Sequence, residues 1–277
     1  MLKTRVISGV FLIALIAAMN LLGGPVMCCI LFLIALQGLF EFYRAVGIYK
    51  EEGKHSVLEC LGYAGTAVYY LAAVMISDQR LLYLMLIICI VLVAMLAAYV
   101  FAFPKFEGAL VMKAFFGFMY VPVMLSFIFL TRSMQRGEYL VWLIYIVSWI
   151  CDTFAYLTGS LFGKRKLAPI LSPHKSVEGA IGGIVGTVII SVIFSFLFLR
   201  AYDLRSAGNI MVFVLLGVVG GFVSQVGDLA ASAFKRNHDV KDYGKIIPGH
   251  GGVLDRFDSV IFTAPMIYFL AALFFGI

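Results

Sequence analysis

The sequence predicts an all-α integral membrane protein with about nine transmembrane helices. Of its 277 residues, 63% are hydrophobic and only 13% are charged, and the mean hydropathy is +1.04. Soluble globular domains carry about a quarter charged residues. The apolar residues also stand in long uninterrupted runs, and a helix needs about 20 of them to cross a bilayer. Composition therefore excludes an ordinary soluble domain, a disordered chain and a nucleic-acid-binding domain.

Nine apolar runs, separated by polar breaks, follow one another along the chain. The first run follows Lys3 and Arg5. It lacks a convincing cleavage site, so we expect an uncleaved first span. Glycine, proline and charged residues mark the breaks, as at Gly23-Gly24-Pro25. The expected spans are 5–22, 26–46, 56–77, 81–103, 109–131, 139–161, 179–200, 209–234 and 254–276.

Successive loops of a multi-pass protein lie on alternate sides of the membrane, and the basic residues are distributed unevenly between these two sides. Sixteen of the 21 Lys and Arg residues fall on the side of the N-terminus, Lys50 and Lys54 among them. The other five are Arg80, Arg132, Arg136, Arg200 and Arg205. Cytoplasmic loops of membrane proteins carry an excess of Lys and Arg. We therefore expect an odd number of spans, a cytoplasmic N-terminus and a C-terminus outside.

The two halves of the chain differ in the polarity of their spans. Residues 1–140 form mostly apolar spans, which we expect to pack and to face lipid. Their acids Glu41 and Glu59 stand near span ends, where a charge can reach the headgroups. In residues 141–277 polar residues enter the spans, which indicates a catalytic half. Glycines four apart in this half predict close helix packing: Gly179/Gly183, Gly182/Gly186 and Gly217/Gly221.

The densest charge of the chain lies in residues 232–258, which join the last two spans and contain the basic loop 235–252. The segment holds five cations (Lys235, Arg236, Lys241, Lys245, Arg256) and four carboxylates (Asp239, Asp242, Asp255, Asp258). Glycines surround His250 in the stretch Pro248-Gly249-His250-Gly251-Gly252. Glycine permits positive φ angles and lets backbone N–H groups approach a ligand closely. This combination predicts a loop that binds phosphate.

Aspartates in and near this segment are candidate metal ligands. Asp255 and Asp258 stand three residues apart at the expected start of the last helix, hence on one face. Carboxylate oxygens there can hold Mg²⁺ beside a phosphate, although acids at a helix N-terminus can also be simple caps. Asp228 lies inside the preceding span on the same face as Ser232, and Asp152 lies inside an earlier one. An ionisable group at membrane depth marks a functional site, unless it is merely paired with a buried Lys or Arg.

The second basic loop, 163–178, offers a weaker phosphate site. Ser172, Lys175 and Ser176 stand just before a helix, where Ser176 can serve as the N-cap. Hydroxyls, a lysine and exposed helix N–H groups together suit an anion. The basic run 164–166 is interpreted as a surface contact with anionic lipid.

The segment 232–258 resembles the signature of the phosphatidate cytidylyltransferases (CDP-diacylglycerol synthases). Ser172 to Gly179 is similar to a second motif of that family, S-P-x-K-S-x-E-G. The positions of the first signature are filled by Ser232, Phe234, Lys235, Arg236, Lys241, Asp242, Gly244, Ile247, Pro248, His250, Gly251, Gly252, Val253, Asp255, Arg256, Phe257 and Asp258.

The resemblance implies an enzyme that joins CTP to phosphatidic acid, giving CDP-diacylglycerol and pyrophosphate. It implies Mg²⁺, with a second cation as a further expectation, and a multi-pass protein of a bacterial inner membrane whose active site faces the cytoplasm. A homodimer stays open, because the sequence does not determine the oligomeric state. Asp228, Asp255 and Asp258 are the expected metal ligands, and Lys241 and Arg256 are expected to act with them. The expected phosphate contacts are Ser172, Lys175, Ser176, Ser232, Lys235, Arg236, His250, Gly251 and Gly252.

Several assignments stay open on the sequence alone. Arg256 could contact phosphates or pair with an acid, and His250 could position phosphate or shape the turn. A relative could use CTP on another membrane lipid phosphate, such as a prenyl-lipid phosphate. Asp152 and Asp228 inside spans would also suit an ion or solute transporter, although no inverted repeat is visible.

Overall fold

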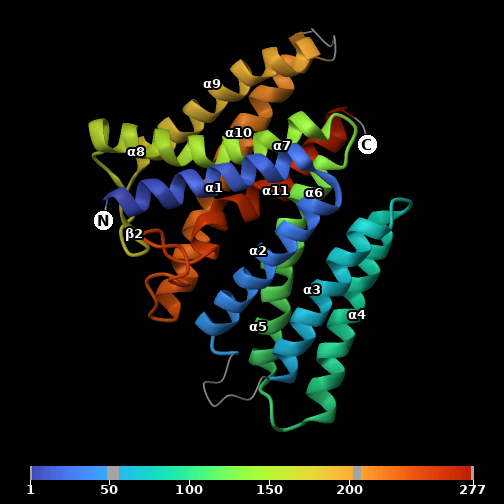
Figure 1. Ribbon diagram of the computed structural model, residues 1–277. Coiled ribbons are helices and arrows are strands. Elements are labelled where there is room, and N and C mark those ends of the chain that lie inside the picture. The colour runs from blue at the N-terminus through green and yellow to red at the C-terminus, as the bar shows by residue number, and fades with distance from the viewer. Residues whose placement is uncertain (1, 49–55, 202–206, 276–277) are drawn as a thin grey trace. The chain divides into compact units, whose positions relative to one another are not determined.

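A computed structural model describes residues 2–48, 56–201 and 207–275 of the chain (Figure 1). Within these ranges, eight helices are long and apolar enough to cross a membrane. The first helix has a shorter apolar stretch, Val6–Leu22. The predicted all-α, multi-pass architecture is confirmed, and the side of the membrane on which each terminus lies stays a prediction. Lys50, Lys54 and Arg205, which entered the charge count, lie outside the described residues.

The helix bounds agree with the expected spans to within a few residues. Two spans are composite, because α5, η1 and α6 form one continuous helix and α7, η2 and α8 form another. In chain order the elements are α1 (Leu2–Leu22), α2 (Gly24–Ala45), α3 (Val57–Met75), α4 (Arg80–Phe101), α5 (Gly108–Phe118), the π-helical η1 (Met119–Val123), α6 (Met124–Arg132), α7 (Gly137–Tyr145), the π-helical η2 (Ile146–Ile150), α8 (Cys151–Phe162), β1 (Lys166–Ala168), β2 (Ser172–Ser176), α9 (Val177–Ala201), α10 (Ala207–Asn237) and α11 (Leu254–Phe275).

The chain forms two compact units that are not simple consecutive halves. The first unit contains Met1–Leu130 and His238–Arg256, and the second contains Thr131–Asn237 and Phe257–Ile277. The loop after α10 therefore belongs with the N-terminal helices. The assignment of a packing role to residues 1–140 and a catalytic role to the remainder stays a prediction.

In the first unit, α2, α3 and α5 pack around buried aromatic side chains. Tyr43 of α2 is fully buried, and its hydroxyl donates to the carbonyl of Ala114 in α5 at 2.8 Å. A Cβ atom at Gly117 of α5 would lie 2.7 Å from the Tyr43 ring, and one at Gly62 of α3 would collide with the Tyr43 hydroxyl. Glycine at both positions therefore makes room for the tyrosine. Figure 1 shows these helices, with α4, running alongside one another.

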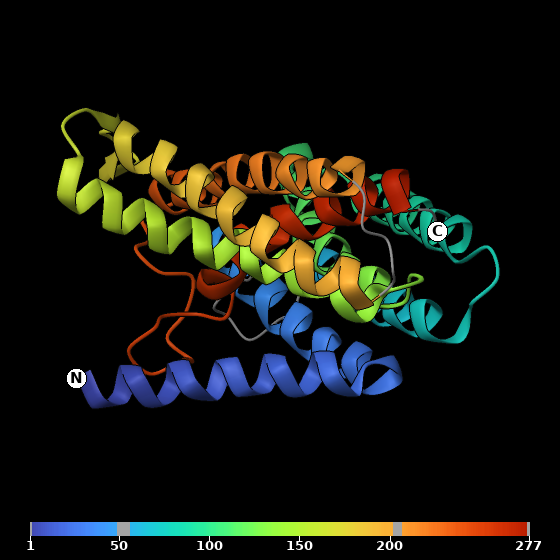
Figure 2. The ribbon, with the colours of Figure 1, turned by 90° about the horizontal axis from the view of Figure 1, so that it is seen from above.

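In the second unit, α9 packs closely against both α8 and α10. A Cβ atom at Gly179 of α9 would lie 2.7 Å from the carbonyl oxygen of Ala155 in α8. One at Gly217 of α10 would lie 2.7 Å from the Cα of Val188 in α9. The close packing that the spaced glycines predict is therefore confirmed. Figures 1 and 2 both show α8 and α9 side by side, joined at one end by the short strands.

The π-helical segment η2 interrupts the helix just before Asp152. Ser148 in this segment donates to the carbonyl of Ile144 at 2.8 Å and shares a 2.7 Å hydrogen bond with Thr263 of α11. A π-helical turn widens the helix and often stands beside a functional site. Here it immediately precedes the first turn of α8, which carries Asp152.

Candidate active site

The loop between α10 and α11 folds into a tight turn around its glycines. The amide of Ile247 donates to the carbonyl of Gly251, and the amide of His250 donates to the carbonyl of Ile247, both at 2.9 Å. Gly249 and Gly251 have φ angles of 78° and 88°, a conformation that L side chains rarely adopt. The expectation that glycines serve positive φ angles here is confirmed for these two positions.

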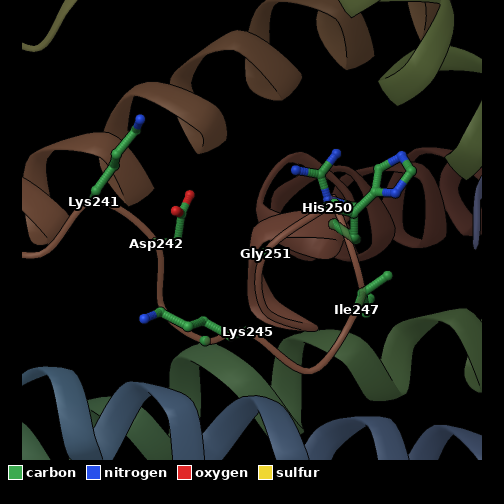
Figure 3. Close-up of a pocket in the computed structure, with 9 residues that line it drawn as sticks. Lys241, Asp242, Lys245, Ile247, His250 and Gly251 are labelled. Atoms are coloured by element: carbon green, nitrogen blue, oxygen red, sulfur yellow. The ribbon is translucent and has the colours of Figure 1, made fainter. Parts of the chain in front are cut away.

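This turn borders a cavity of about 550 Å³ in the first unit. Lys241, Lys245, Arg256 and His250 line it, together with one carboxylate, that of Asp242. In the view of Figure 3, Lys241, Asp242 and His250 point toward the same side of the loop. The Arg256 Nε atom is buried and has no hydrogen-bond partner among the described residues. Cations and N–H donors in such excess suit a phosphate-bearing ligand.

Helix α1 holds the turn from one side. The Ser8 hydroxyl donates to the carbonyl of Pro248 at 3.1 Å and lies 2.7 Å from His250 Nδ1. Figure 2 shows the loop reaching α1. His250 thus helps to shape the turn, and its contact with phosphate stays a prediction.

An acid of α2 holds the loop from the other side. Glu41 is only 2% exposed, so the expectation that its charge reaches the headgroups is wrong. Its Oε1 accepts hydrogen bonds from the Val253 amide at 3.0 Å and from Gln37 Nε2 at 3.1 Å, and its Oε2 accepts one from the Leu254 amide at 2.8 Å. Glu59 of α3 is also buried, at 0% exposed, which corrects the same expectation.

Asp255, in the first turn of α11, also ties the loop together. Its Oδ2 accepts hydrogen bonds from the amides of Tyr243 at 2.9 Å and Gly252 at 3.0 Å, and the residue is 7% exposed. The sequence left a capping role open for this acid, and the structure shows that the carboxylate binds N–H groups of the preceding loop. Its role as a metal ligand stays a prediction.

The second basic loop belongs to the second unit and forms an antiparallel hairpin, which the sequence did not predict. Lys166 of β1 pairs with Ser176 of β2. The Ser176 hydroxyl accepts a hydrogen bond from the Gly179 amide at 3.1 Å. This bond confirms the predicted N-cap of α9. Glu178 accepts from the amide of Lys164 at 3.0 Å, which fixes the exit of α8 to the start of α9.

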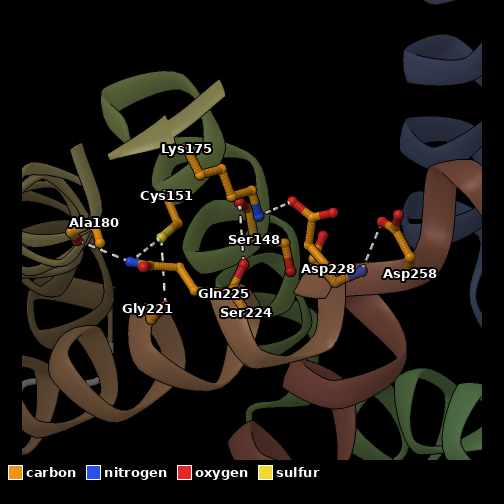
Figure 4. A network of polar contacts seen from close by, with 10 residues as sticks. Ser148, Cys151, Lys175, Ala180, Gly221, Ser224, Gln225, Asp228 and Asp258 are labelled. Atoms are coloured by element: carbon orange, nitrogen blue, oxygen red, sulfur yellow. Dashed lines mark hydrogen bonds and ion pairs between the residues drawn. The ribbon is translucent and has the colours of Figure 1, made fainter. Parts of the chain in front are cut away.

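A second cavity, of about 470 Å³, opens beside this hairpin. Ser172, Lys175, Ser176, Asp152 and Asp228 all line it. The Lys175 ammonium forms an ion pair with the Asp228 carboxylate, as Figure 4 shows, and the two side chains are 27% and 25% exposed. The structure therefore joins a predicted phosphate contact to a predicted metal ligand. Asp228 is thus paired with a lysine, which was the alternative interpretation of this acid, and it still lines the cavity.

Gln225 is a residue of this site that the sequence analysis missed. Its Nε2 donates to the carbonyl of Ala180 at 2.9 Å and to the Cys151 sulfur at 3.4 Å (Figure 4). It thereby connects α10 to both α9 and α8 one turn before Asp228. Its position three residues before Asp228 was the available signal, since that spacing places both on one helical face.

Asp258 lies near Asp228 in the second unit. A Cβ atom at Gly227 would lie 2.9 Å from the Asp258 carbonyl oxygen, so α10 and α11 cross closely there. The charges of Asp228 and Lys235 both act on the Asp258 carboxylate. Among the described residues, no group of three His, Cys, Asp or Glu side chains stands together as a metal site. Two carboxylates with substrate phosphates are nevertheless a usual setting for Mg²⁺, so Asp228 and Asp258 fit that ion.

The remaining predicted contacts occupy the end of α10. Lys235 and Arg236 lie in its last turn. Ser232 is partly buried one turn after Asp228, and Arg236 is exposed. The structure thus divides the predicted residues between two neighbourhoods. The first unit holds Lys241, His250, Gly251, Gly252, Asp255 and Arg256, and the second holds Ser172, Lys175, Ser176, Asp228, Ser232, Lys235, Arg236 and Asp258.

Fold and site together define a multi-pass membrane protein with a cation-lined cavity that suits phosphates and a second cavity lined by Lys175 and by Asp152 and Asp228. The model of the cytidylyltransferase family matches residues 3–274, and the chain belongs to that family. The phosphatidate cytidylyltransferase of Staphylococcus haemolyticus (strain JCSC1435) is 32% identical over 270 residues, which are 97% of this chain and 98% of the relative. That of Staphylococcus saprophyticus is 29% identical over the same shares, and that of Staphylococcus aureus (strain COL) is 39% identical over 153 residues, 54% of this chain and 55% of the relative. The resemblance seen in the sequence motifs is therefore confirmed.

Proposed function

We propose that this protein transfers the cytidylyl group of CTP to phosphatidic acid, giving CDP-diacylglycerol and pyrophosphate. Full-length similarity to phosphatidate cytidylyltransferases supports this function. The observation that carries it in the structure is the cavity lined by Lys241, Lys245 and Arg256 beside the glycine turn. A cation-lined cavity of this kind suits the triphosphate of a nucleotide. A family member that acts on another lipid phosphate is the nearest alternative.

The reaction replaces one phosphorus–oxygen bond of the α-phosphate by another. A phosphate oxygen of phosphatidic acid attacks the α-phosphorus of CTP and forms the new bond. The bond from that phosphorus to the bridging oxygen breaks, and pyrophosphate leaves with the electron pair. The nucleophile is already ionised near neutral pH, so a general base is not required. The main obstacle is the repulsion between two anionic groups, which positioned cations must reduce.

We assign the two substrates to the two cavities. The first, bordered by the polar loop, would take CTP, with Lys241, Lys245 and Arg256 at the phosphates. The second has Tyr156 and Leu167 among its lining residues, and Tyr156 of α8 is 75% exposed. An apolar rim beside a lysine suits a lipid headgroup, so Lys175, Ser172 and Ser176 would hold the phosphate of phosphatidic acid.

We propose Mg²⁺ as the metal of the reaction, held by Asp228 and Asp258, with Asp255 and a second cation as further expectations from the sequence. The metal would neutralise phosphate charge and stabilise the departing pyrophosphate. When a cation or substrate binds, Lys175 can leave Asp228 and contact phosphate, because both side chains are partly exposed. CTP is soluble and phosphatidic acid lies in the bilayer. A site on the cytoplasmic side of a bacterial inner membrane would meet both substrates.

The proposal is tested with purified full-length protein in detergent, radiolabelled CTP and a panel of lipid phosphates. We expect a cytidine-labelled lipid from phosphatidic acid with Mg²⁺ and none with EDTA. Product from a polyprenyl phosphate, but not from phosphatidic acid, would replace the proposed substrate by the alternative. Absence of a CTP-dependent product from every lipid would refute the function.

A further inference from the structure

The carboxylate of Glu41 bridges two segments that lie far apart in the sequence. Its hydrogen bonds to the amides of Val253 and Leu254 connect α2 to the start of α11, across 212 and 213 residues. The first amides of a helix have no partner within the helix, and a negative charge there is stabilised by the helix dipole. Gln37, one turn earlier on α2, donates to the same carboxylate and fixes its orientation.

Two glycines of the loop pack directly against this carboxylate. A Cβ atom at Gly244 would lie 2.5 Å from Glu41 Oε1, 2.8 Å from Cδ and 3.2 Å from Cγ. One at Gly252 would lie 2.5 Å from Glu41 Oε2 and 2.7 Å from the Gly244 amide nitrogen. Positive φ angles are found at Gly249 and Gly251, but not at these two positions. Gly244 and Gly252 are therefore required by the space that Glu41 occupies.

These contacts place Glu41 behind the residues that line the first cavity. Gly244 is itself a lining residue, and Gly252 follows the lining residue Gly251. Arg256, another lining residue, follows directly after Leu254 and Asp255 in the first turn of α11. One buried carboxylate thus supports the loop before the turn, after the turn and at the helix start.

We propose that Glu41 is a positioning residue for the reaction, which holds the nucleotide loop and the first turn of α11 in the geometry that CTP requires. This inference rests on the proposed function of the loop. Glu41 touches none of the reacting atoms in this account and acts through the backbone that it binds. Ångström-scale misplacement of a binding group can cost about 10²-fold in rate, so we expect a loss of that order in kcat/KM for CTP when Glu41 is changed to Gln.

The Glu41→Gln variant is the first test, because an amide of equal size keeps one acceptor oxygen but turns its NH₂ group toward the other backbone amide. Glu59→Gln is its matched control, since Glu59 is a buried acid of the same unit. We expect the Glu41 variant to raise KM for CTP with little change in KM for phosphatidic acid, and the Glu59 variant to retain wild-type values. An equal rise in KM for CTP and for phosphatidic acid, or an equal rise in the Glu41 and Glu59 variants, would overturn the positioning role.

A pair of size changes tests the contact itself. Gly244→Ala adds a methyl group whose nearest neighbours are all atoms of Glu41, and Glu41→Asp withdraws the carboxylate by one methylene. We expect the loss in kcat/KM for CTP that Gly244→Ala causes to be roughly tenfold smaller in the Glu41→Asp background than in the wild type. A coupling of this size is typical of residues in contact. Equal damage in both backgrounds would contradict the inference.

Limited trypsin digestion separates failure of this inference from failure of the proposed function. Lys241 and Lys245 are exposed in the loop, and we expect cleavage there to accelerate in Glu41→Gln but not in Glu59→Gln. Lack of CTP turnover by the wild type would refute the proposed function. The digestion would still test whether Glu41 holds the loop in place. Unchanged cleavage together with unchanged activity of Glu41→Gln would refute the role of Glu41.

Discussion

Replacing Lys175 by Met should separate the stability of the protein from its activity. The Lys175–Asp228 ion pair is 27% and 25% exposed, so solvent screens it substantially. Pairs of this kind contribute at most about 1 kcal/mol to folding. Loss of one preorganised group that stabilises transition-state charge costs about 10²–10³-fold in kcat. The variant should therefore unfold almost as the wild type does, while its turnover falls by at least two orders of magnitude.

The assay for this prediction combines two measurements on the same detergent-purified sample. Thermal unfolding reports the stability change, and initial rates of lipid-linked cytidine formation report kcat and KM for phosphatidic acid. Lys164→Met is the matched control, because Lys164 is an exposed cation of the same loop that does not line the cavity. Near-normal turnover of Lys175→Met, or a loss of activity fully explained by unfolding, would refute the role of Lys175 at the phosphate.

Three further changes test other parts of the account. Asp258→Ala should abolish Mg²⁺-dependent turnover without loss of folded protein, and wild-type-like turnover would remove this acid from the site. Gly179→Ala should lower the unfolding free energy by about 1–3 kcal/mol, because overpacking of a tight contact has that cost and the new Cβ would lie 2.7 Å from the carbonyl of Ala155. Thermal unfolding measures this, and an unchanged midpoint would contradict the packing. Ser8→Ala removes the hydroxyl that holds His250, and should raise KM for CTP several-fold with no change in stability. An unchanged KM in initial-rate measurements would show that the turn does not depend on α1.

The spans could be predicted because each is encoded locally. An apolar run between polar breaks suffices for a membrane helix, and the bounds of α2 and α11 were expected to within two residues. The same holds for the Ser176 cap, whose partner is three residues away. Glycines four apart also indicated close helix packing, and the structure shows that the helices in question are α8 with α9 and α9 with α10.

The contacts that shape the site could not be predicted, because they join distant parts of the chain. Glu41 looks like any acid near a span end until α11 is placed 212 residues later in the sequence. The pairing of Lys175 with Asp228 spans 53 residues. It depends on the hairpin between α8 and α9, which no pattern in residues 163–178 predicted. Motif spacing singled out Lys175 and Asp228 as candidate site residues, and only the fold shows that they pair.

Cytidylyl transfer to phosphatidic acid is tested most directly by following the two ends of the triphosphate separately. Purified protein is incubated with phosphatidic acid, Mg²⁺ and CTP labelled either at the α-phosphate or at the γ-phosphate. We expect the α-label to appear in CDP-diacylglycerol and the γ-label in pyrophosphate, in equal amounts. Transfer of the γ-label to lipid, or release of pyrophosphate without labelled lipid, would contradict cytidylyl transfer to phosphatidic acid.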